Sequence, residues 1–552
     1  MKEDGHDEDD LDTLMEHLGD FGRYQAWQFT LHILSAITAG LNMLSLVTVA
    51  AVPEHRCQIP EENYTVVQNN SLLSEYIPMI NGKLDNCHLY NLTSNGTYPC
   101  ESWIYDTTYY KSSRGMEWNF VCDNRWMGAV AQSAYMFGTF TGAVTLGNMA
   151  DKYGRKPIFC WSAVLQLILG VGVAFSPNYY AFLVIRYLYG IFGSAGSYIP
   201  GFVLTMELVG PSKRSLCGIS FQAAFAFGIM LVAAWGSIIK DRTLLQVIYG
   251  CHALVLMGHF WFMDESPRWL WANGRIKESV RVIQKGLKMN KRQKKIDDTK
   301  YMNKTPQVDD QQNEAGMFDL FKTPRLRKMT LNICLAWFAN SLVYYGLSLN
   351  TSSIKGNPYL VLFIMGLVEI PSYIITIYVM DKLGRRSITA TNMIFGGLCC
   401  IIATNLTAGS STSSGFVFMG KFLIASSFAV VYNYSAELFP TVVRNSAMGL
   451  GSTCARTSGA LTPLIILFDS FDPKLPSTIF AVISIVSGFL CLFLPETLNK
   501  AMPQTIEDGE NYGVGDTCFT TCLSKKTERI RKDEDEEAKS AVPPSELEPL
   551  KQ

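Results

Sequence analysis

Long apolar runs alternate with polar segments along most of this chain. Polar residues concentrate in four places: residues 1–24, 51–125, 264–328 and the tail beyond Lys500. The other runs are nearly free of charge and about twenty residues long, which is the length an α-helix needs to cross the hydrocarbon of a bilayer. We therefore predict twelve membrane-spanning helices, at residues 25–50, 127–149, 157–176, 180–205, 216–239, 243–263, 329–349, 358–380, 387–408, 415–436, 446–468 and 477–494.

Composition agrees with this pattern. Hydrophobic residues make up 48% of the 552 residues and charged residues only 17%, which is more apolar material than one soluble core normally holds. The acidic start, with Glu3 and Asp4, differs from the basic start of a cleavable signal peptide, so we expect the first span to be retained. These features predict an all-α membrane protein and not an enzyme.

Positive charge predicts the orientation. The segment 264–328 holds sixteen lysine and arginine residues, and positive loops stay cytoplasmic. We therefore expect a plasma-membrane protein with cytoplasmic segments 1–24, 264–328 and 495–552, the last largely disordered. The segment 51–125 then becomes an extracellular loop.

That loop has two features that are typical of extracellular segments. It contains glycosylation sequons at Asn63, Asn69, Asn91 and Asn95. It also contains four cysteines, which predict two disulfides with three possible connectivities: Cys57, Cys87, Cys100 and Cys122.

An internal repeat with an offset of 230 residues runs through the chain. Asp151-Lys152-Tyr153-Gly154-Arg155-Lys156 recurs as Asp381-Lys382-Leu383-Gly384-Arg385-Arg386, and Glu207 with Arg214 recurs as Glu437 with Arg444. The repeat predicts two six-span bundles, 25–263 and 329–494, joined by the linker 264–328. Parallel repeats are typical of alternating-access carriers, which bind substrate between the halves near the midplane.

We interpret the repeated charges as gates, because charge pairs at helix ends can hold one conformation and still break. For Lys152, Lys156 and Arg386 the alternative is a role in topology alone. The predicted gate residues are Asp151, Arg155, Glu207, Arg214, Asp381, Arg385, Glu437 and Arg444.

Two charges are expected at the middle of the bilayer. Glu369 lies about twelve residues into its span and Arg456 about twelve residues after Arg444, so at about 1.5 Å per residue both reach the centre. Charges there need a cavity or a partner, and the positions 230 residues earlier hold Thr139 and Ala226. We expect both charges to face substrate; the alternative is a buried Glu369–Arg456 ion pair that fixes helix packing.

Several motifs together resemble one transporter family. They are Gly147-x-x-x-Asp151-Lys152-x-Gly154-Arg155-Lys156, Pro53-Glu54-His55-Arg56-Cys57, Glu117-Trp118-Asn119, Glu265-Ser266-Pro267-Arg268-Trp269-Leu270, Glu437-Leu438-Phe439-Pro440-Thr441-x-x-Arg444 and Pro495-Glu496-Thr497. The first resembles the loop signature of the major facilitator superfamily, and the set resembles its organic cation, carnitine and organic anion transporter family.

The resemblance implies a twelve-span major facilitator fold and a transport activity. It also implies that five residues line the substrate cavity: Tyr198, Gln222, Trp337, Tyr344 and Glu369. Cation carriers of this family have an acid at the position that Arg456 occupies in this chain. An arginine there resembles the anion carriers and the carnitine branch. The presence of Glu369, by contrast, resembles the cation and carnitine branches.

One acid and one base in the same cavity suit a zwitterion or a small amine. We therefore predict a carrier of organic cations or carnitine-like zwitterions, with membrane lipid and a coupling ion as its candidate other partners. An organic anion exchanger is the alternative, and a non-transporting receptor is a further one that the two sets of gate motifs disfavour. We expect no cofactor, metal or nucleic-acid site.

The four sequons generate a direct test of topology. Glycosidase treatment of the protein from intact cells should increase its mobility on a gel. Replacing Asn63, Asn69, Asn91 and Asn95 together by glutamine should abolish that increase. Wild-type protein whose mobility is unaffected by the enzyme would contradict an extracellular loop at 51–125.

Overall fold

The computed structural model describes residues 11–59, 73, 75–80, 83–91, 96–292, 317–350, 354, 356–407, 409–500, 502–513 and 516. Each predicted span coincides with a long helix or with a short series of helices, so the predicted all-α, twelve-span fold is confirmed. In the described part, seven helical segments are long and apolar enough to cross a membrane by length and composition alone. The helices α5, α16 and α20 fall outside that set, and all three contribute side chains to the central cavity described below.

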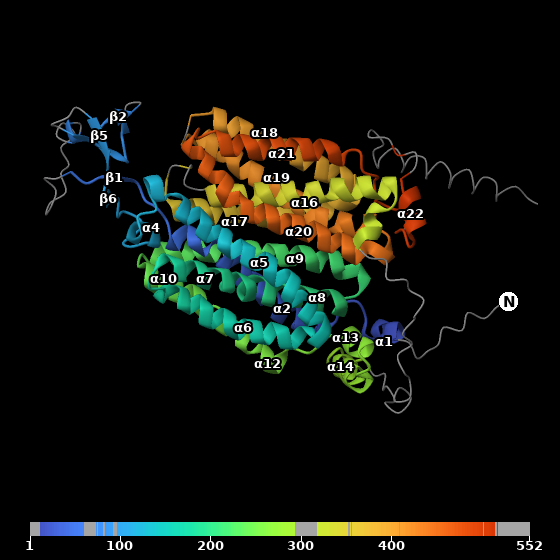
Figure 1. Cartoon of the computed structure of the whole chain (residues 1–552). Helices are drawn as coiled ribbons and strands as arrows, with labels where there is room; N and C mark the ends of the chain where they lie inside the picture. Colours follow the sequence, from blue (N-terminus) through green and yellow to red (C-terminus); the bar gives the residue numbers. More distant parts are fainter. Residues whose placement is uncertain are drawn as a thin grey trace, which may run out of the picture.

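The two halves of the repeat form two helical bundles that lie side by side (Figure 1). The first bundle contains α2 (Arg23–Val49), α5 (Trp126–Tyr153), α6 (Arg155–Gly172) with η3 (Val173–Phe175), α7 (Tyr179–Gly190), η4 (Ile191–Ala195), α8 (Gly196–Leu208), α9 (Pro211–Ile238), α10 (Arg242–Cys251), α11 (Leu254–Met257) and α12 (His259–Phe262). The second contains α16 (Pro324–Leu349), α17 (Pro358–Leu383), α18 (Arg385–Asn405), α19 (Ser411–Leu438), α20 (Thr441–Ile466) with η7 (Leu467–Ser470), and α21 (Leu475–Cys491).

Two of the predicted spans are interrupted within their length, and two others only end in a 3-10 turn. The fourth is α7 followed by a π-helical segment, η4, and then α8. Glycines at 190, 193 and 196 and the proline at 200 weaken the regular hydrogen-bond ladder there. The sixth span is divided into α10, α11 and α12.

Glycines allow the closest helix contacts in the first bundle. A Cβ atom added at Gly228 of α9 would lie 2.2 Å from the carbonyl oxygen of Ile37 on α2. A Cβ atom added at Gly40 of α2 would lie 2.1 Å from the carbonyl oxygen of Phe225. Since real Cβ atoms do not approach oxygen so closely, the α2–α9 distance depends on both glycines.

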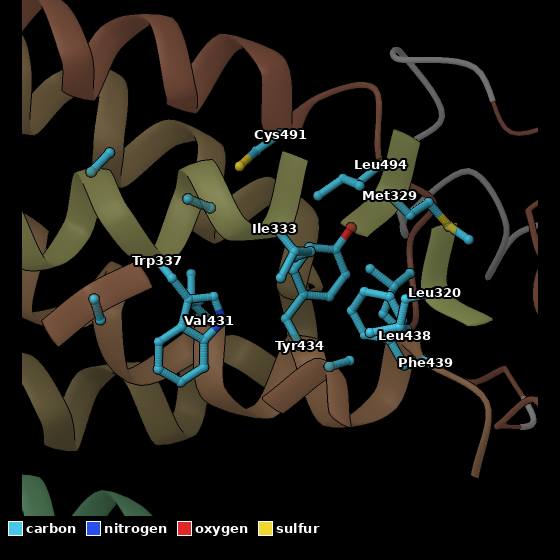
Figure 2. Packing of buried hydrophobic residues seen from close by; sticks show 14 of the residues in the cluster. Leu320, Met329, Ile333, Trp337, Val431, Tyr434, Leu438, Phe439, Cys491 and Leu494 are labelled. Atoms are coloured by element: carbon cyan, nitrogen blue, oxygen red, sulfur yellow. The ribbon is translucent and has the colours of Figure 1, made fainter. Parts of the chain in front are cut away.

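Buried apolar side chains hold the second bundle together. Figure 2 shows part of this cluster, in which Ile333 of α16, Tyr434 and Leu438 of α19, and Cys491 of α21 pack near one another. The hydroxyl of Tyr434 donates to the carbonyl oxygen of Pro495 at 2.6 Å, so its polar atom is satisfied inside an apolar region. Trp337 belongs to the same cluster.

The segment between α2 and α5 forms a small domain at one end of the bundles, which we call the strand-bearing end. Its strands pair as three antiparallel ladders, a feature that the all-α prediction did not include: β1 (His55–Cys57) with β6 (Trp103–Tyr105), β2 (Met79–Ile80) with β3 (Lys83–Leu84), and β4 (His88–Asn91) with β5 (Gly96–Pro99). The helical turns α4 (Arg114–Glu117) and η2 (Cys122–Asn124) follow.

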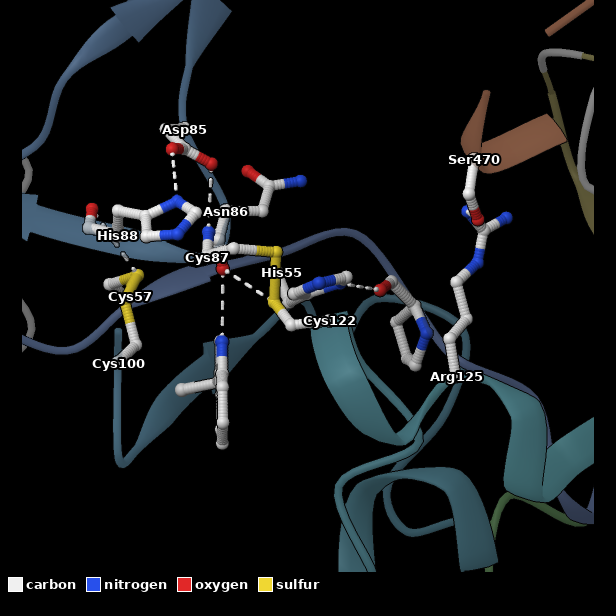
Figure 3. Close-up of a disulfide and its surroundings, with 12 residues drawn as sticks. His55, Cys57, Asp85, Asn86, Cys87, His88, Cys100, Cys122, Arg125 and Ser470 are labelled. Carbon is white, nitrogen blue, oxygen red and sulfur yellow. Dashed lines mark hydrogen bonds and ion pairs between the residues drawn. A yellow bond between two sulfur atoms is a disulfide. The ribbon is translucent and has the colours of Figure 1, made fainter. Parts of the chain in front are cut away.

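Two disulfides fix this domain: Cys57 is joined to Cys100 and Cys87 to Cys122 (Figure 3). This connectivity is one of the three that the sequence left open. Of the predicted glycosylation sites, Asn91 ends β4, whereas Asn63, Asn69 and Asn95 lie outside the described residues.

Polar contacts join the two halves at the strand-bearing end. The guanidinium of Arg125, which precedes α5, pairs with the carboxylate of Asp469 in η7 at 2.5 Å. Figure 3 shows Arg125 near the disulfide-bonded Cys122, which it follows by three positions in the chain. A second contact joins α5 of the first half to α20 of the second half: Ser133 Oγ donates to the carbonyl oxygen of Ala460 at 2.8 Å. The two bundles are therefore connected close to the disulfide-bonded domain.

Short helices cover the opposite end, which carries the repeated charge motifs and is called here the motif-bearing end. The predicted linker 264–328 is not only a connection, because it forms α13 (Pro267–Ala272) and α14 (Ile276–Met289). Apolar side chains of α14 pack on those of α1 (Leu11–Leu18), so that the two short helices are held against each other. The packed residues include Leu14, Leu18, Ile283 and Leu287.

Part of the predicted tail is also folded. Residues 506–511 form α22 (Ile506–Asn511), and the Glu510 carboxylate accepts hydrogen bonds from the backbone of Arg325 and Leu326 at the start of α16. A carboxylate is favourable there because the first amides of a helix have no partner within the helix. Nearly all of the tail beyond residue 513 lies outside the described residues.

The α2–α9 contact predicts a strong difference between two glycine-to-alanine substitutions. Gly228→Ala should destabilise the protein by roughly 1–3 kcal/mol, because its Cβ has no room beside Ile37. Gly449→Ala on α20, where nothing lies within 4 Å of the added Cβ, is the matched control and should be neutral. Thermal unfolding of the detergent-solubilised protein measures both, and equal midpoints for the two variants would contradict the close contact.

Candidate functional site

A cavity lies between the two bundles near the middle of the helices. Its side chains come from both halves of the repeat, as expected for a site at the centre of a duplicated structure. The lining residues are Met43, Met136, Thr139, Ser194, Ala195, Tyr198, Ile199, Gln222, Phe225, Ser341, Tyr344, Tyr345, Phe428, Tyr432, Ser452, Ala455, Arg456 and Gly459.

Four of the six predicted binding residues line this cavity: Tyr198, Gln222, Tyr344 and Arg456. Trp337 and Glu369 do not line it, which corrects their predicted place. Trp337 is fully buried and donates from its indole nitrogen to Ser435 Oγ at 2.9 Å. Its ring lies 4.2 Å from that of Tyr432, measured between centroids, so Trp337 supports a cavity wall from behind.

Glu369 is held in a buried polar network within the second bundle. The hydroxyls of Tyr344 and Tyr373 each donate to its Oε2 at 2.9 Å. The ammonium of Lys421 lies 3.0 Å from its Oε1, and both members of this ion pair are 0% exposed. The alternative of a Glu369–Arg456 ion pair is therefore wrong, because the buried partner of Glu369 is Lys421.

Lys421 also fixes the position of Tyr344. Its Nζ donates to Ser348 Oγ at 2.5 Å and to the carbonyl oxygen of Tyr344 at 3.3 Å. The same nitrogen lies 3.1 Å from the centroid of the Tyr344 ring, within the range of a cation–π contact. Since Tyr344 lines the cavity, the ion pair stands one residue behind the cavity wall.

Lys421 is not among the predicted site residues, although the sequence carries a signal for it. Lys421 is a lone base within the predicted span 415–436, and a charge at such a place calls for a partner. Arg186 in the span 180–205 was missed in the same way. It is fully buried on α7, donates to Gln132 Oε1 at 3.1 Å and lies over the ring of Tyr135.

Arg456 differs from these buried charges because it lines the cavity. Its guanidinium donates to Ser452 Oγ one turn earlier on α20. Among the residues that the structure describes, no carboxylate lies within ion-pair distance of it. Arg456 therefore presents an uncompensated positive charge to whatever occupies the cavity.

Aromatic rings form much of the remaining wall. Tyr198 contacts Phe225 at a centroid distance of 6.5 Å, and Phe428 contacts Tyr432 at 5.7 Å. Tyr345 lies edge-on to Tyr344 at 5.2 Å. Such rings can stabilise a cationic group or an apolar body of a substrate.

The predicted gate residues form the same network twice at the motif-bearing end. Arg155 lies 3.0 Å from Glu207 and 3.1 Å from Asp151. In the second half, Arg385 lies 3.0 Å from Glu437 and 3.2 Å from Asp381. Each arginine thus connects a helix turn, α5–α6 or α17–α18, to a third helix of its own half, α8 or α19.

The members of each network are not equally buried. The side chains of Asp151 and Asp381 are 71% and 69% exposed, whereas those of Glu207 and Glu437 are 22% and 21% exposed. Exposed ion pairs contribute little free energy, so the arginine–glutamate pair dominates in both halves.

The last two predicted gate residues contact the backbone. Arg214 donates from Nε to the carbonyl oxygen of Val209 at 3.2 Å, and Arg444 donates likewise to Phe439 at 3.4 Å. These contacts repeat at the 230-residue offset and hold the turn before each helix.

A second pair of carboxylates, which is not among the predicted gate residues, supports the two turns. Glu265 accepts a hydrogen bond from the backbone of Lys156 at 3.0 Å, and Glu496 accepts one from Arg385 at 2.8 Å. Burial raises the pKa of the Glu265 carboxyl, although hydrogen bonds from the backbone of Ser266 and Lys156 oppose this effect.

In architecture the chain is similar to the proton:xylose symporter XylE of E. coli, with a TM-score of 0.59 over 88% of this chain and 98% of that chain. The sequence identity is 15%, so this likeness concerns the fold alone. A family model described as sugar (and other) transporter matches residues 77–506.

Relatives with known names match almost the whole chain. The organic cation transporter protein of Drosophila melanogaster is 36% identical, over 91% of this chain and 95% of its own length. Human solute carrier family 22 member 16 is 30% identical (90% and 92%), as is solute carrier family 22 member 6-B of Xenopus laevis (90% and 94%). The chain belongs to the organic cation, carnitine and organic anion transporter family of the major facilitator superfamily. This transporter is therefore a multi-pass membrane carrier of small organic molecules and not an enzyme.

The unequal burial of the network predicts unequal effects on transport. If the network acts as a gate, Glu437→Gln should lower the maximal uptake rate of the transporter more than Asp381→Asn. The expected losses correspond to roughly 1–3 kcal/mol for the buried acid and about 0–1 kcal/mol for the exposed one.

Uptake is measured per molecule at the cell surface, and Glu207→Gln should reproduce the effect of Glu437→Gln from the other half. Asp472→Asn, an exposed acid at the strand-bearing end, serves as the control. Unchanged maximal uptake for both glutamate variants would reduce the network to a structural role.

Proposed function

We propose that this transporter moves small organic ions that carry a carboxylate or a similar anionic group, both zwitterions and organic anions, by alternating access. The observation that carries the proposal is the charge distribution around the cavity. Arg456 lines the cavity without an acidic partner in the described part of the chain, whereas Glu369 is neutralised behind the wall by Lys421.

The cost of the unpaired charge supports an anionic substrate group. A guanidinium in the centre of a membrane protein is unfavourable unless water, a polar group or an opposite charge compensates it. Here Ser452 supplies one acceptor. A substrate carboxylate could accept two parallel hydrogen bonds from the guanidinium, a geometry that arginine favours over lysine.

The aromatic wall extends the proposal to zwitterions. An ammonium group attached to the same substrate would lie among the rings of Tyr198, Tyr345 and Tyr432, which can stabilise it without a full negative charge. The prediction of a carnitine-like zwitterion is therefore kept, but the reason differs: the rings, and not Glu369, receive the cationic end.

Transport of simple organic cations is the second candidate. It is supported by the 36% identity to the protein named organic cation transporter in Drosophila melanogaster. Arg456 would repel such a substrate, so this candidate requires the repulsion to be weak in a hydrated cavity.

The proposal includes a plasma-membrane location with both termini cytoplasmic, and a coupling ion as a further candidate partner. Support for the orientation comes from the disulfide-bonded strand-bearing end, which suits an oxidising exterior, and from the positive charge of the linker. The Arg125–Asp469 pair would then join the halves on the outside.

Substitution of Arg456 distinguishes the two candidates. Arg456→Gln should weaken binding of 3-phenylpropionate and phenylalanine by about 1.5–3 kcal/mol, or roughly 10–150-fold, because a charge-assisted hydrogen bond is lost. Binding of phenethyltrimethylammonium, a cation of similar size, should be unchanged or stronger.

Equilibrium binding of the three labelled probes to the purified full-length transporter gives the comparison, and Arg456→Lys is the control that keeps the charge. A wild-type protein that binds the cation best, and an Arg456→Gln variant with the same order of affinities, would contradict the proposal and favour the cation candidate.

A further inference from the structure

We propose that Lys421 is a specificity-determining residue, which sets the charge preference of the cavity by neutralising Glu369. The inference rests on the function proposed above and adds a residue that does not itself line the cavity. Its basis is the completely buried Lys421–Glu369 pair directly behind Tyr344.

The pair is close enough for its charge to act on a bound ion. Tyr344 lines the cavity, its hydroxyl contacts the Glu369 carboxylate and its ring contacts the Lys421 ammonium. Tyr344 therefore touches both the pair and the cavity. In a region that excludes water, a unit charge at such a distance is weakly screened.

The net charge of the Lys421–Glu369 pair decides whether the cavity favours a bound cation or a bound anion. With both residues present the pair is neutral, and the positive charge of Arg456 dominates the cavity. Without the lysine, the Glu369 carboxylate would attract a cation and repel an anion. Without the acid, the lysine would add to the attraction for anions.

Position in the repeat supports a specific role for this acid. The residue 230 positions before Glu369 is Thr139, whose hydroxyl donates to the backbone of its own helix. The duplicated scaffold therefore does not require a carboxylate at this position. The three helices that meet at the pair, α16, α17 and α19, all belong to the second half.

Four variants separate the charge from the packing. Lys421→Met leaves the acid uncompensated, Glu369→Gln leaves the base uncompensated, and the double variant Lys421→Met with Glu369→Gln is neutral like the wild type. Lys421→Arg keeps the pair. Binding constants for phenethyltrimethylammonium and 3-phenylpropionate, measured on purified full-length transporter, give a cation-to-anion affinity ratio for each protein.

The two single variants should shift this ratio in opposite directions. We expect Lys421→Met to raise it by about tenfold and Glu369→Gln to lower it by a similar factor. The double variant and Lys421→Arg should have ratios near that of the wild type. If the ion pair were purely structural, both single variants would instead weaken binding of both probes. The affinity ratio would then not shift in opposite directions.

The outcomes also separate this inference from the proposed function. If the wild type prefers the carboxylate and depends on Arg456, but both single variants keep the wild-type ratio or shift it in one direction, the role of Lys421 is overturned and the proposed function stands. If the wild type shows no preference for the carboxylate, the proposed function is overturned. Should Lys421→Met fail to fold, the comparison of Glu369→Gln with the double variant decides, because their ratios must differ.

Discussion

Burial of charge in the centre of a membrane protein is the constraint on which this structure depends. An isolated ion there is costly, so each charged group needs an opposite charge, a set of hydrogen bonds or a solvated cavity. Glu369 has the first two, through Lys421 and the hydroxyls of Tyr344 and Tyr373. Because Tyr344 is also part of the cavity wall, the solution to the burial problem fixes one side of the candidate binding site.

The gene-level duplication implied by the repeat supplies the frame but not the chemistry of this site. At the motif-bearing end the two halves agree in detail: Arg155 with Glu207 and Arg385 with Glu437 have the same separation of 3.0 Å. In the centre they differ, because Thr139 and Ala226 occupy the positions that correspond to Glu369 and Arg456. The two halves therefore share a scaffold, whereas the charges at these two central positions belong to the second half.

The two ends of the protein are stabilised by different means. At the motif-bearing end, carboxylates bind backbone amides at helix starts, as Glu265, Glu496 and Glu510 do. Such contacts are local and leave the halves separate. At the strand-bearing end, the Cys87–Cys122 disulfide is followed after two residues by Arg125, whose ion pair with Asp469 crosses between the halves.

The sequence by itself determined the twelve spans, the repeat and the positions of its two sets of charges, because these depend on local composition and on residue spacing. The family was predicted from the resemblance of several motifs. The sequence also identified Tyr198, Gln222, Tyr344 and Arg456, which line the cavity. Only the tertiary structure decided which buried residues pair with one another. Glu369 and Lys421 are 52 positions apart on different helices, and no spacing rule states that α17 and α19 bring them within 3.0 Å. The same holds for Trp337, which was expected to line the cavity but lies behind its wall, since burial is set by the neighbouring helices and not by the helix that carries the residue.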